Sequence, residues 1–336
     1  MKTIQLTSPE QLRLVEIDIP KIGPEEVLIK VSYTGVCGSD LHTYAGHNPY
    51  IQYPVTMGHE ISGVIVEKGT ACPDPFKPGD TVAINPLISC GECSTCKAGH
   101  PHICKNFKLY GREFAGGFAD YVKVKASHLV HIPAGIPLDV AAMAEPYAVG
   151  IHAVNRSGLA LGDRVVVLGG GPIGLVTALA ARASGASRVI VSEVSEYRLK
   201  LAKQLGFDAV NSKKQDLKRH VMETTDGVGA DIVFETAATA ATAAQLTDLL
   251  RHRGTAVLVG LYGRLAEVDL RAVVIRELNL TGSAIYSQRE FEHALTHMPV
   301  TQMHQLISHR LPLEATDEGF RAAKSAIDAM KVLIEP

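Results

Sequence analysis

Four cysteines stand close together in the sequence with a spacing typical of a zinc-binding loop. They follow the pattern C-x2-C-x2-C-x7-C at Cys90, Cys93, Cys96 and Cys104. Cysteines three positions apart can bend round one ion, and four thiolates fill the shell of a structural zinc without leaving an open position. The spacing is also compatible with an iron–sulfur cluster, whereas two disulfides fit poorly with a reducing compartment. We therefore expect a structural zinc in this loop.

A second segment has the glycine spacing of a dinucleotide-binding turn. The motif G-x-G-x-x-G is formed by Gly169, Gly170, Gly171, Pro172, Ile173 and Gly174. An apolar strand pattern, Val165–Leu168, precedes it, and a helical pattern, Leu175–Ala183, follows. The first glycine permits a tight turn, the second lets the backbone approach a pyrophosphate, and the third lets the helix pack against the strand. The helix N-terminus then offers unpaired N–H groups to the phosphates.

An acidic residue follows at the position expected to contact the ribose of the cofactor. Glu193 lies nineteen residues beyond Gly174, after the next predicted strand. A carboxylate there accepts hydrogen bonds from ribose hydroxyls and repels a 2′-phosphate, so NAD is expected in preference to NADP. Arg198 is close enough in the sequence to complicate that preference, and we count it among the cofactor-binding candidates.

Three further segments contain residues that commonly bind metals or move protons. They hold Cys37, Ser39, Asp40 and His42, then His59 and Glu60, and then Glu145. Scattered residues of these types are usually unrelated. Their combination with a zinc loop and a nucleotide motif favours a reactive metal site.

Composition sets the class of protein that must position these residues. The 336 residues are enough for two domains of roughly 100–200 residues. Hydrophobic residues make up 46% of the chain, and the net charge is −2, so no basic excess is available to bind nucleic acid. Residues 1–20 lack the apolar stretch of a secretory signal, so we expect a cytoplasmic location. The uncharged run Val165–Ala181 is shorter than the ~20 residues of a membrane span, and no membrane partner is expected.

The two parts of the chain differ in their pattern of elements. The first 147 residues contain short β-like runs separated by turn residues, which predicts a β-rich domain. From about Val149, apolar strands alternate with helical segments, a pattern typical of a doubly wound parallel sheet. The strands predicted there are Arg164–Leu168, Val189–Ser192, Asp231–Phe234, Thr255–Val259 and Leu278–Thr281.

The metal-type segments, the cysteine loop and the glycine motif occur in the same order as in zinc-dependent medium-chain dehydrogenases. The chain resembles this family over essentially its whole length. The resemblance implies an α/β protein whose catalytic domain, residues 1–147 and 285–336, is a partly open β-barrel similar to the small co-chaperonin fold. A Rossmann domain, residues 148–284, would be inserted within it. Family members are usually homodimers or homotetramers.

The same resemblance implies a catalytic zinc, the second zinc of the chain. Cys37 and His59 would be ligands, and a carboxylate would complete the protein set. Either Glu60 binds the metal directly, or Glu145 binds it directly or through water. Asp40 would orient His59 from behind and fix its tautomer.

The resemblance also implies the chemistry. Zinc lowers the pKa of a bound hydroxyl, and the resulting alkoxide pushes its hydride toward the nicotinamide ring. Ser39 and His42 match the family's proton relay, in which the serine takes the hydroxyl proton and passes it toward the histidine and solvent.

The segment Ala144–Pro146 resembles the branch that acts on polyols, threonine and vicinal diols. We therefore expect NAD-dependent oxidation of a secondary alcohol in a small polyol, sugar acid or sugar-alcohol phosphate, with L-threonine and 2,3-butanediol as alternatives. Sorbitol dehydrogenases typically have a tyrosine at the position of Thr43 and an Arg-Tyr pair at Ile285-Tyr286, which argues against sorbitol itself. The candidate pocket residues are Tyr44, Phe118, Tyr286 and Arg289.

Two functions of other classes compete with this interpretation. A non-catalytic nucleotide sensor would retain the fold but lose Cys37, His59 or the relay, and all of these are present. A zinc hydrolase would also use an open zinc site, but the nucleotide motif argues against it.

Overall fold

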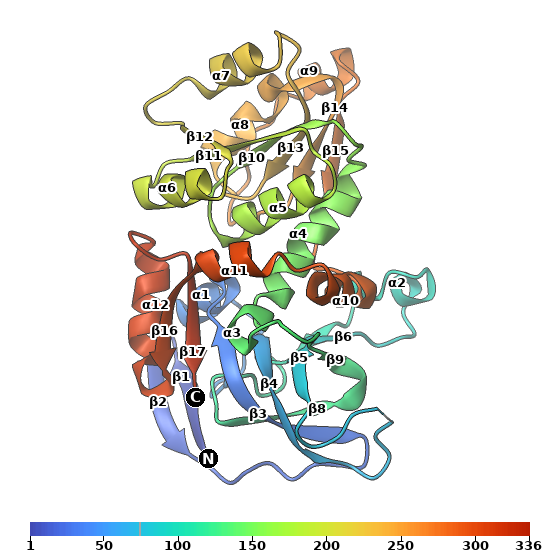
Figure 1. Cartoon of the computed structure of the whole chain (residues 1–336), viewed down its shortest axis with the longest axis vertical. Coiled ribbons are helices and arrows are strands. Elements are labelled where there is room, and N and C mark those ends of the chain that lie inside the picture. The colour runs from blue at the N-terminus through green and yellow to red at the C-terminus, as the bar shows by residue number, and fades with distance from the viewer. Residues whose placement is uncertain (74) are drawn as a thin grey trace. The chain divides into compact units, whose positions relative to one another are not determined.

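The structure, a computed structural model, describes residues 1–73 and 75–336. The chain forms two compact units, and each can be followed by its colours in Figure 1. The first unit comprises Met1–Glu145 and Ser287–Pro336, and the second comprises Pro146–Tyr286. The first unit is therefore discontinuous in sequence.

A seven-stranded sheet forms the centre of the first unit. Its strands are β3 (Glu26–Gly35), β4 (Glu60–Lys68), β5 (Thr81–Ile84), β8 (Tyr121–Lys125), β9 (Leu129–His131), β16 (Ile307–Pro312) and β17 (Lys331–Glu335). They lie in the order β16-β17-β3-β4-β5-β9, with β8 also paired to β3. Alternate residues of β3, Val27, Ile29 and Val31, enter the apolar core, as expected for a strand whose period is two.

The last strand of the chain joins this sheet beside one of the first. β17 pairs antiparallel with β3, where Leu333 faces Gly35, and parallel with β16, where Lys331 faces Ile307. On its other side β3 pairs antiparallel with β4, where Gly35 faces Glu60. The end of β3, the start of β4 and the C-terminal strand are thus held together by main-chain hydrogen bonds.

Shorter elements complete the first unit. The strands are β1 (Lys2–Ser8), β2 (Gln11–Glu16), β6 (Leu87–Ile88) and β7 (Lys108–Leu109), and the helices are α1 (Gly38–Tyr44), α2 (Ser94–Lys97), α3 (Leu138–Ala141), α10 (Gln288–Thr296), α11 (Val300–Leu306) and α12 (Thr316–Ser325). Phe320 of α12 packs with Phe118 and with Val332 and Ile334 of β17, so this helix covers part of the core.

The second unit is a six-stranded parallel sheet. Its strands are β10 (Arg164–Leu168), β11 (Arg188–Glu193), β12 (Asp208–Asn211), β13 (Ala230–Glu235), β14 (Leu250–Leu258) and β15 (Asn279–Gly282). Their order, β12-β11-β10-β13-β14-β15, reverses direction at β10, which is the doubly wound arrangement of dinucleotide-binding sheets. The prediction of this sheet is confirmed. Its helices are α4 (Ala144–Ser157), whose first two residues belong to the first unit, and α5 (Pro172–Ala183), α6 (Glu196–Gln204), α7 (Leu217–Thr224), α8 (Ala240–Leu249) and α9 (Leu270–Ile275).

Two details of the second unit follow from local sequence. The central strand β10 is an apolar run in which Val165–Leu168 are fully buried, as both faces of a parallel sheet require. The Ala-rich stretch forms the ordinary helix α8, which begins at a capping box between Thr239 and Thr242. No helix in the described part of the chain is long and apolar enough to span a membrane.

Candidate active site and metal centres

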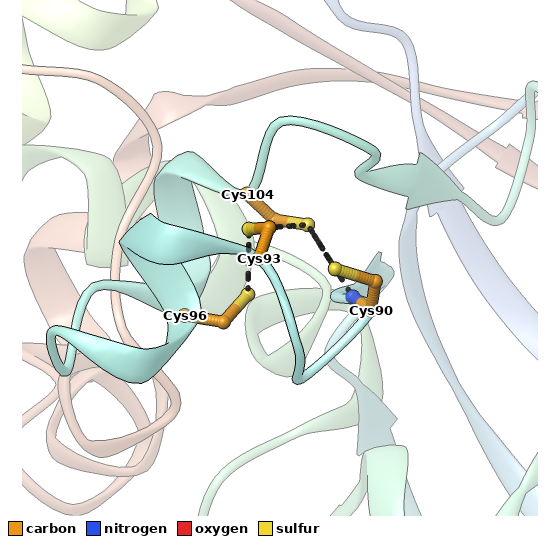
Figure 2. A group of neighbouring side chains, drawn as sticks. All are labelled: Cys90, Cys93, Cys96 and Cys104. Atoms are coloured by element: carbon orange, nitrogen blue, oxygen red, sulfur yellow. Dashed lines mark hydrogen bonds between the residues drawn. The ribbon is translucent and has the colours of Figure 1, made fainter.

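The four cysteines of the loop converge on one point (Figure 2). The Sγ–Sγ distances are 3.5 Å for Cys93–Cys96, 3.8 Å for Cys93–Cys104 and 3.4 Å for Cys90–Cys104. In a zinc tetrahedron with Zn–S bonds of ≈ 2.3 Å, the sulfur atoms would lie about 3.8 Å apart. None of the cysteines, all of which lie among the described residues, forms a disulfide. The donor set and spacing therefore fit a closed zinc site.

Local hydrogen bonds favour the thiolate form of Cys93 and Cys104, whereas burial and the neighbouring cysteines raise the pKa of the Cys96 thiol to about 12. The backbone N–H groups of Cys90 and Asn106 both donate to Cys104 Sγ, at 3.3 Å each. Hydrogen bonds with the Thr95 hydroxyl and with the backbone of Cys96 and Lys105 lower the pKa of the Cys93 thiol to about 5. A thiolate is the form that binds zinc.

A second group of side chains that could bind a metal ion lies where β3 and β4 meet. Potential ligand atoms of Cys37, His59 and Glu60 all lie within 4.8 Å of one another. The pairing of Gly35 with Glu60 explains this, because Cys37 follows the end of β3 and His59 precedes the start of β4. One thiolate, one imidazole and one carboxylate form a donor set that suits zinc and leaves a fourth position open.

A buried carboxylate supports two members of this group. Asp40 Oδ1 lies 3.5 Å from His59 Nδ1, and Asp40 Oδ2 accepts a hydrogen bond from the Cys37 N–H at 3.0 Å. Burial disfavours charge on His59, but the Asp40 carboxylate and the Cys37 thiol raise the pKa of His59 well above its usual value. With Nδ1 facing Asp40, Nε2 is the nitrogen left available to a metal.

The carboxylate of the group is Glu60, and it has a partner that sequence analysis missed. Its side chain is 1% exposed, and both oxygens contact Lys331 Nζ, at 2.6 and 2.7 Å. Glu145, in the first turn of α4, is not part of the three-residue group found among the described residues. Its charge still acts on this region, because Glu145 helps to raise the pKa of Lys331.

The two candidate relay residues share the helix that begins at Cys37. Ser39 and His42 lie three positions apart on α1, and residues at that spacing are neighbours on a helix surface. Both are exposed, and the His42 ring centroid is 6.3 Å from that of His47. This surface position suits the solvent end of a proton path.

The glycine motif forms a tight turn between β10 and α5. Gly169 has φ +101°, a value that favours glycine. A Cβ on Gly174 would lie 1.8 Å from the Gly169 carbonyl oxygen, so the third glycine permits the close approach that the motif requires. Pro172 occupies the first turn of α5, and the free N–H groups of that turn suit an anion.

The acidic residue and the arginine meet beside this turn. Glu193, at the end of β11, accepts hydrogen bonds from the Gly170 N–H at 3.0 Å and from the Val194 and Ser195 N–H groups at 2.6 and 3.0 Å. Arg198 Nη1 lies 3.9 Å from Glu193 Oε2. The Nε atom of Arg198 is buried and has no hydrogen-bond partner among the described residues. An anion at this turn would therefore find a donor as well as a carboxylate.

The substrate-pocket candidates have different environments. Phe118 is fully buried and packs against Phe320 in the core, which makes it a packing residue. Tyr44 contacts the same Phe320 ring, with centroids 5.3 Å apart. Tyr286 is fully buried and Arg289 is exposed.

Two family models and several relatives of known function match this chain. Residues 23–134 match the family described as alcohol dehydrogenase GroES-like domain, and residues 172–299 match the zinc-binding dehydrogenase family. The chain is 40% identical to the sorbitol dehydrogenase of Halalkalibacterium halodurans, over 94% of this chain and 93% of that protein. L-threonine 3-dehydrogenases and a 2-dehydro-3-deoxy-L-galactonate 5-dehydrogenase also match.

Solved structures of similar proteins share the fold. The 2R,3R-butanediol dehydrogenase of Bacillus subtilis has a TM-score of 0.93 and 31% identity, covering 100% of this chain and 99% of that one. A zinc-binding dehydrogenase of Sinorhizobium meliloti bound to NADP has a TM-score of 0.91 and 33% identity, also covering 100% and 99%. The chain thus belongs to the zinc-dependent medium-chain dehydrogenases and is a zinc-dependent oxidoreductase of their polyol-type group.

Proposed function

We propose that this chain oxidises a secondary alcohol of a polyol, sugar acid or sugar-alcohol phosphate and transfers the hydride to NAD. The observation that carries the proposal is the group of Cys37, His59 and Glu60, which offers three unlike ligands and one open position. The first unit would be the catalytic domain and the second would bind the dinucleotide.

Each residue of the site has a task in this reaction. Bound zinc would act as a Lewis acid toward the substrate hydroxyl, and the nicotinamide would accept the hydride. Cys37, His59 and Glu60 would hold the metal, and Asp40 would keep the imidazole and the Cys37 backbone in place. Ser39 would accept the hydroxyl proton and pass it to His42, from which it reaches solvent.

The second unit supplies the cofactor site. The turn Gly169–Gly174 would carry the pyrophosphate, and Glu193 would accept hydrogen bonds from the ribose hydroxyls. The carboxylate favours NAD, while the unpaired Arg198 Nε offers a donor to the 2′-phosphate of NADP. NAD remains our first choice.

We further infer a homo-oligomer, either a dimer or a tetramer, in the cytoplasm. Five apolar side chains are more than 60% exposed between residues 261 and 275, in the segment that precedes the edge strand β15 in the sequence. Large exposed apolar patches are uncommon on soluble monomers. A reducing compartment would keep the four cysteines available to zinc.

A substrate panel tests the proposed function. Polyols, sugar acids, sugar-alcohol phosphates, L-threonine and butanediol isomers would each be assayed with NAD and NADP, and zinc would be measured per chain. We expect two zinc ions and turnover of at least one sugar-derived alcohol. If L-threonine or butanediol is turned over faster than the sugar-derived alcohols, that alternative is the better assignment of the substrate. If no member reacts with zinc and cofactor bound, the proposal is wrong.

A further inference from the structure

An ion pair of the first unit is almost completely removed from water. The side chain of Glu60 on β4 is 1% exposed, and that of Lys331 on β17 is 3% exposed. Removing two charges from water is costly, and a well-packed apolar pair often stabilises a protein equally well or better. Stability alone is therefore a weak reason for this pair, and its position beside Cys37 and His59 suggests another.

The ammonium group of Lys331 has every donor engaged. Its Nζ contacts Glu60 Oε1 at 2.6 Å, Glu60 Oε2 at 2.7 Å and the Val36 carbonyl oxygen at 3.3 Å. A lysine ammonium has three N–H donors, so this geometry satisfies the group and restrains it. Val36 directly precedes Cys37, so Lys331 links the carboxylate to the backbone that carries the thiol.

The carboxylate of Glu60 can still bind a metal while Lys331 holds it. A carboxylate has about four lone-pair sites on its two oxygens. The two contacts with Lys331 use one site on each oxygen and leave the others free. Glu60 therefore has the capacity to accept from Lys331 and to ligate an ion between Cys37 and His59.

A glycine makes room for this carboxylate. Gly35 of β3 faces Glu60 across the antiparallel pair. A Cβ on Gly35 would lie 1.8 Å from Glu60 Oε2 and 2.8 Å from Glu60 Cδ. The carboxylate thus lies across Gly35, and any larger residue there would displace it.

We propose that Lys331 and Gly35 are positioning residues that fix the Glu60 carboxylate beside Cys37 and His59 as a preformed third ligand. This inference rests on the proposed function, because it requires a metal at that group. It also makes the metal site depend on the C-terminal strand, since Lys331 is 271 positions away from Glu60 in the sequence.

The test measures zinc affinity at this site rather than activity. Wild-type protein and the variants Lys331→Met, Gly35→Ala, Glu60→Gln and Glu60→Gln/Lys331→Met would be dialysed against graded chelator concentrations, and bound zinc would be measured. Hydrogen-bonded partners of metal ligands typically contribute 10–100-fold to affinity, so we expect losses of about that size for Lys331→Met and Gly35→Ala. The zinc of the four-cysteine loop and the circular dichroism spectrum report folding.

The variants differ in the charges that they leave buried, so an effect of an unpaired charge can be separated from the loss of a positioning contact. Lys331→Met leaves a buried carboxylate unpaired, whereas the double variant removes both charges and Gly35→Ala retains both. If Lys331 acts through Glu60, adding Lys331→Met to Glu60→Gln will cause no further loss of zinc. A matched control is Lys2→Met, because Lys2 Nζ contacts Glu314 at 2.6 Å on the exposed surface. That control should bind zinc like the wild type.

Two results would overturn the inference. One is wild-type zinc affinity in both folded Lys331→Met and folded Gly35→Ala. The other is an equal loss from Lys331→Met whether residue 60 is Glu or Gln, which would indicate a purely structural role. A wild-type protein that binds only the four-cysteine zinc would instead contradict the proposed function itself.

Discussion

At the scale of single residues, two side chains of opposite charge lie beside the glycine turn, and we expect them to set the cofactor preference. Glu193 and Arg198 lie 3.9 Å apart, and a 2′-phosphate would be repelled by the first and attracted by the second. We predict that Glu193→Gln strengthens NADPH binding relative to NADH by about tenfold, equal to about 1.4 kcal/mol. The amide oxygen can retain a hydrogen bond from the turn, so the fold should persist. Fluorescence titration with both reduced cofactors measures the ratio.

The matched control for this prediction is Arg198→Met, which should weaken NADPH binding relative to NADH binding. Arg198 contributes its backbone N–H to the N-cap of α6, and methionine retains that group. If the ratio of NADPH affinity to NADH affinity is unchanged in both variants, neither charge contributes to discrimination at the 2′ position.

The sequence identifies some site residues better than others, for a physical reason. Cys37, His59 and Glu60 are recognisable because metal-binding side chains are chemically distinctive and the resemblance supplies their context. Lys331 and Gly35 have no such signal. Gly35 faces Glu60 across the β3–β4 pair, and Lys331 lies on β17, which pairs with β3, so only the folded sheet brings the three residues together.

At the scale of elements, the four-cysteine loop is short and lacks a core of its own. Its helix α2 has only four residues and none is buried. We predict that Cys93→Ser lowers the zinc content from two ions per chain to one and lowers the melting temperature, because metal binding replaces apolar packing here. Elemental analysis and thermal denaturation measure the two effects.

Cys72 provides the control for that loop. It is a buried free thiol outside the loop, and its Sγ lies 3.3 Å from the Glu26 carbonyl oxygen. Cys72→Ala should retain both zinc ions. Loss of zinc in this variant, or retention of two ions in Cys93→Ser, would contradict the structural zinc site.

One carboxylate connects neighbouring strands at one end of the parallel sheet in the second unit. Asp231, near the start of β13, accepts hydrogen bonds from the Arg164 N–H at 2.8 Å and from Arg251 Nε at 2.5 Å. Burial alone would raise the pKa of Asp231, but these hydrogen bonds lower it below its usual value. Asp231 thereby connects β10, β13 and β14.

We predict that Asp231→Asn destabilises the protein by about 1–3 kcal/mol at pH 7. Because the folded-state pKa is lowered, the stabilisation is present above the unfolded pKa of about 3.9 and is lost as pH falls below it. Denaturant unfolding at pH 7 and pH 3 measures the free energy of unfolding of both proteins. The difference between wild type and Asp231→Asn should be smaller at pH 3 than at pH 7. A constant difference would mean that the charge of Asp231 is not responsible.

At this scale, one strand of the parallel sheet was not predicted from the sequence. The central strands β10 and β13 are recognisable because buried parallel strands are continuous apolar runs. β12 was missed because it has four residues, begins at Asp208 and ends at Asn211, and lies at the edge of the sheet. Its position depends on pairing with β11 rather than on its own composition.

At the scale of the whole molecule, the proposed oligomer gives the remaining prediction. Leu265 is fully exposed and Val274 of α9 is 77% exposed, and both precede the edge strand β15 in the sequence. Such side chains add nothing to the core of one chain, but they would be buried if a second copy covered them. We predict that Leu265→Glu/Val274→Glu converts a dimer or tetramer into a folded monomer of 36.0 kDa.

Light scattering after size exclusion measures the mass, and circular dichroism confirms that the variant is folded. Leu161→Glu is the matched control, because Leu161 is an equally exposed leucine, at 90%, in the same unit but far from this segment in the sequence. It should keep the wild-type mass. If the double variant retains the wild-type mass as well, residues 261–275 do not form the contact between copies. If these residues do form the contact, the two introduced carboxylates would be buried there without partners. Desolvating them costs several kcal/mol each, which would separate the copies.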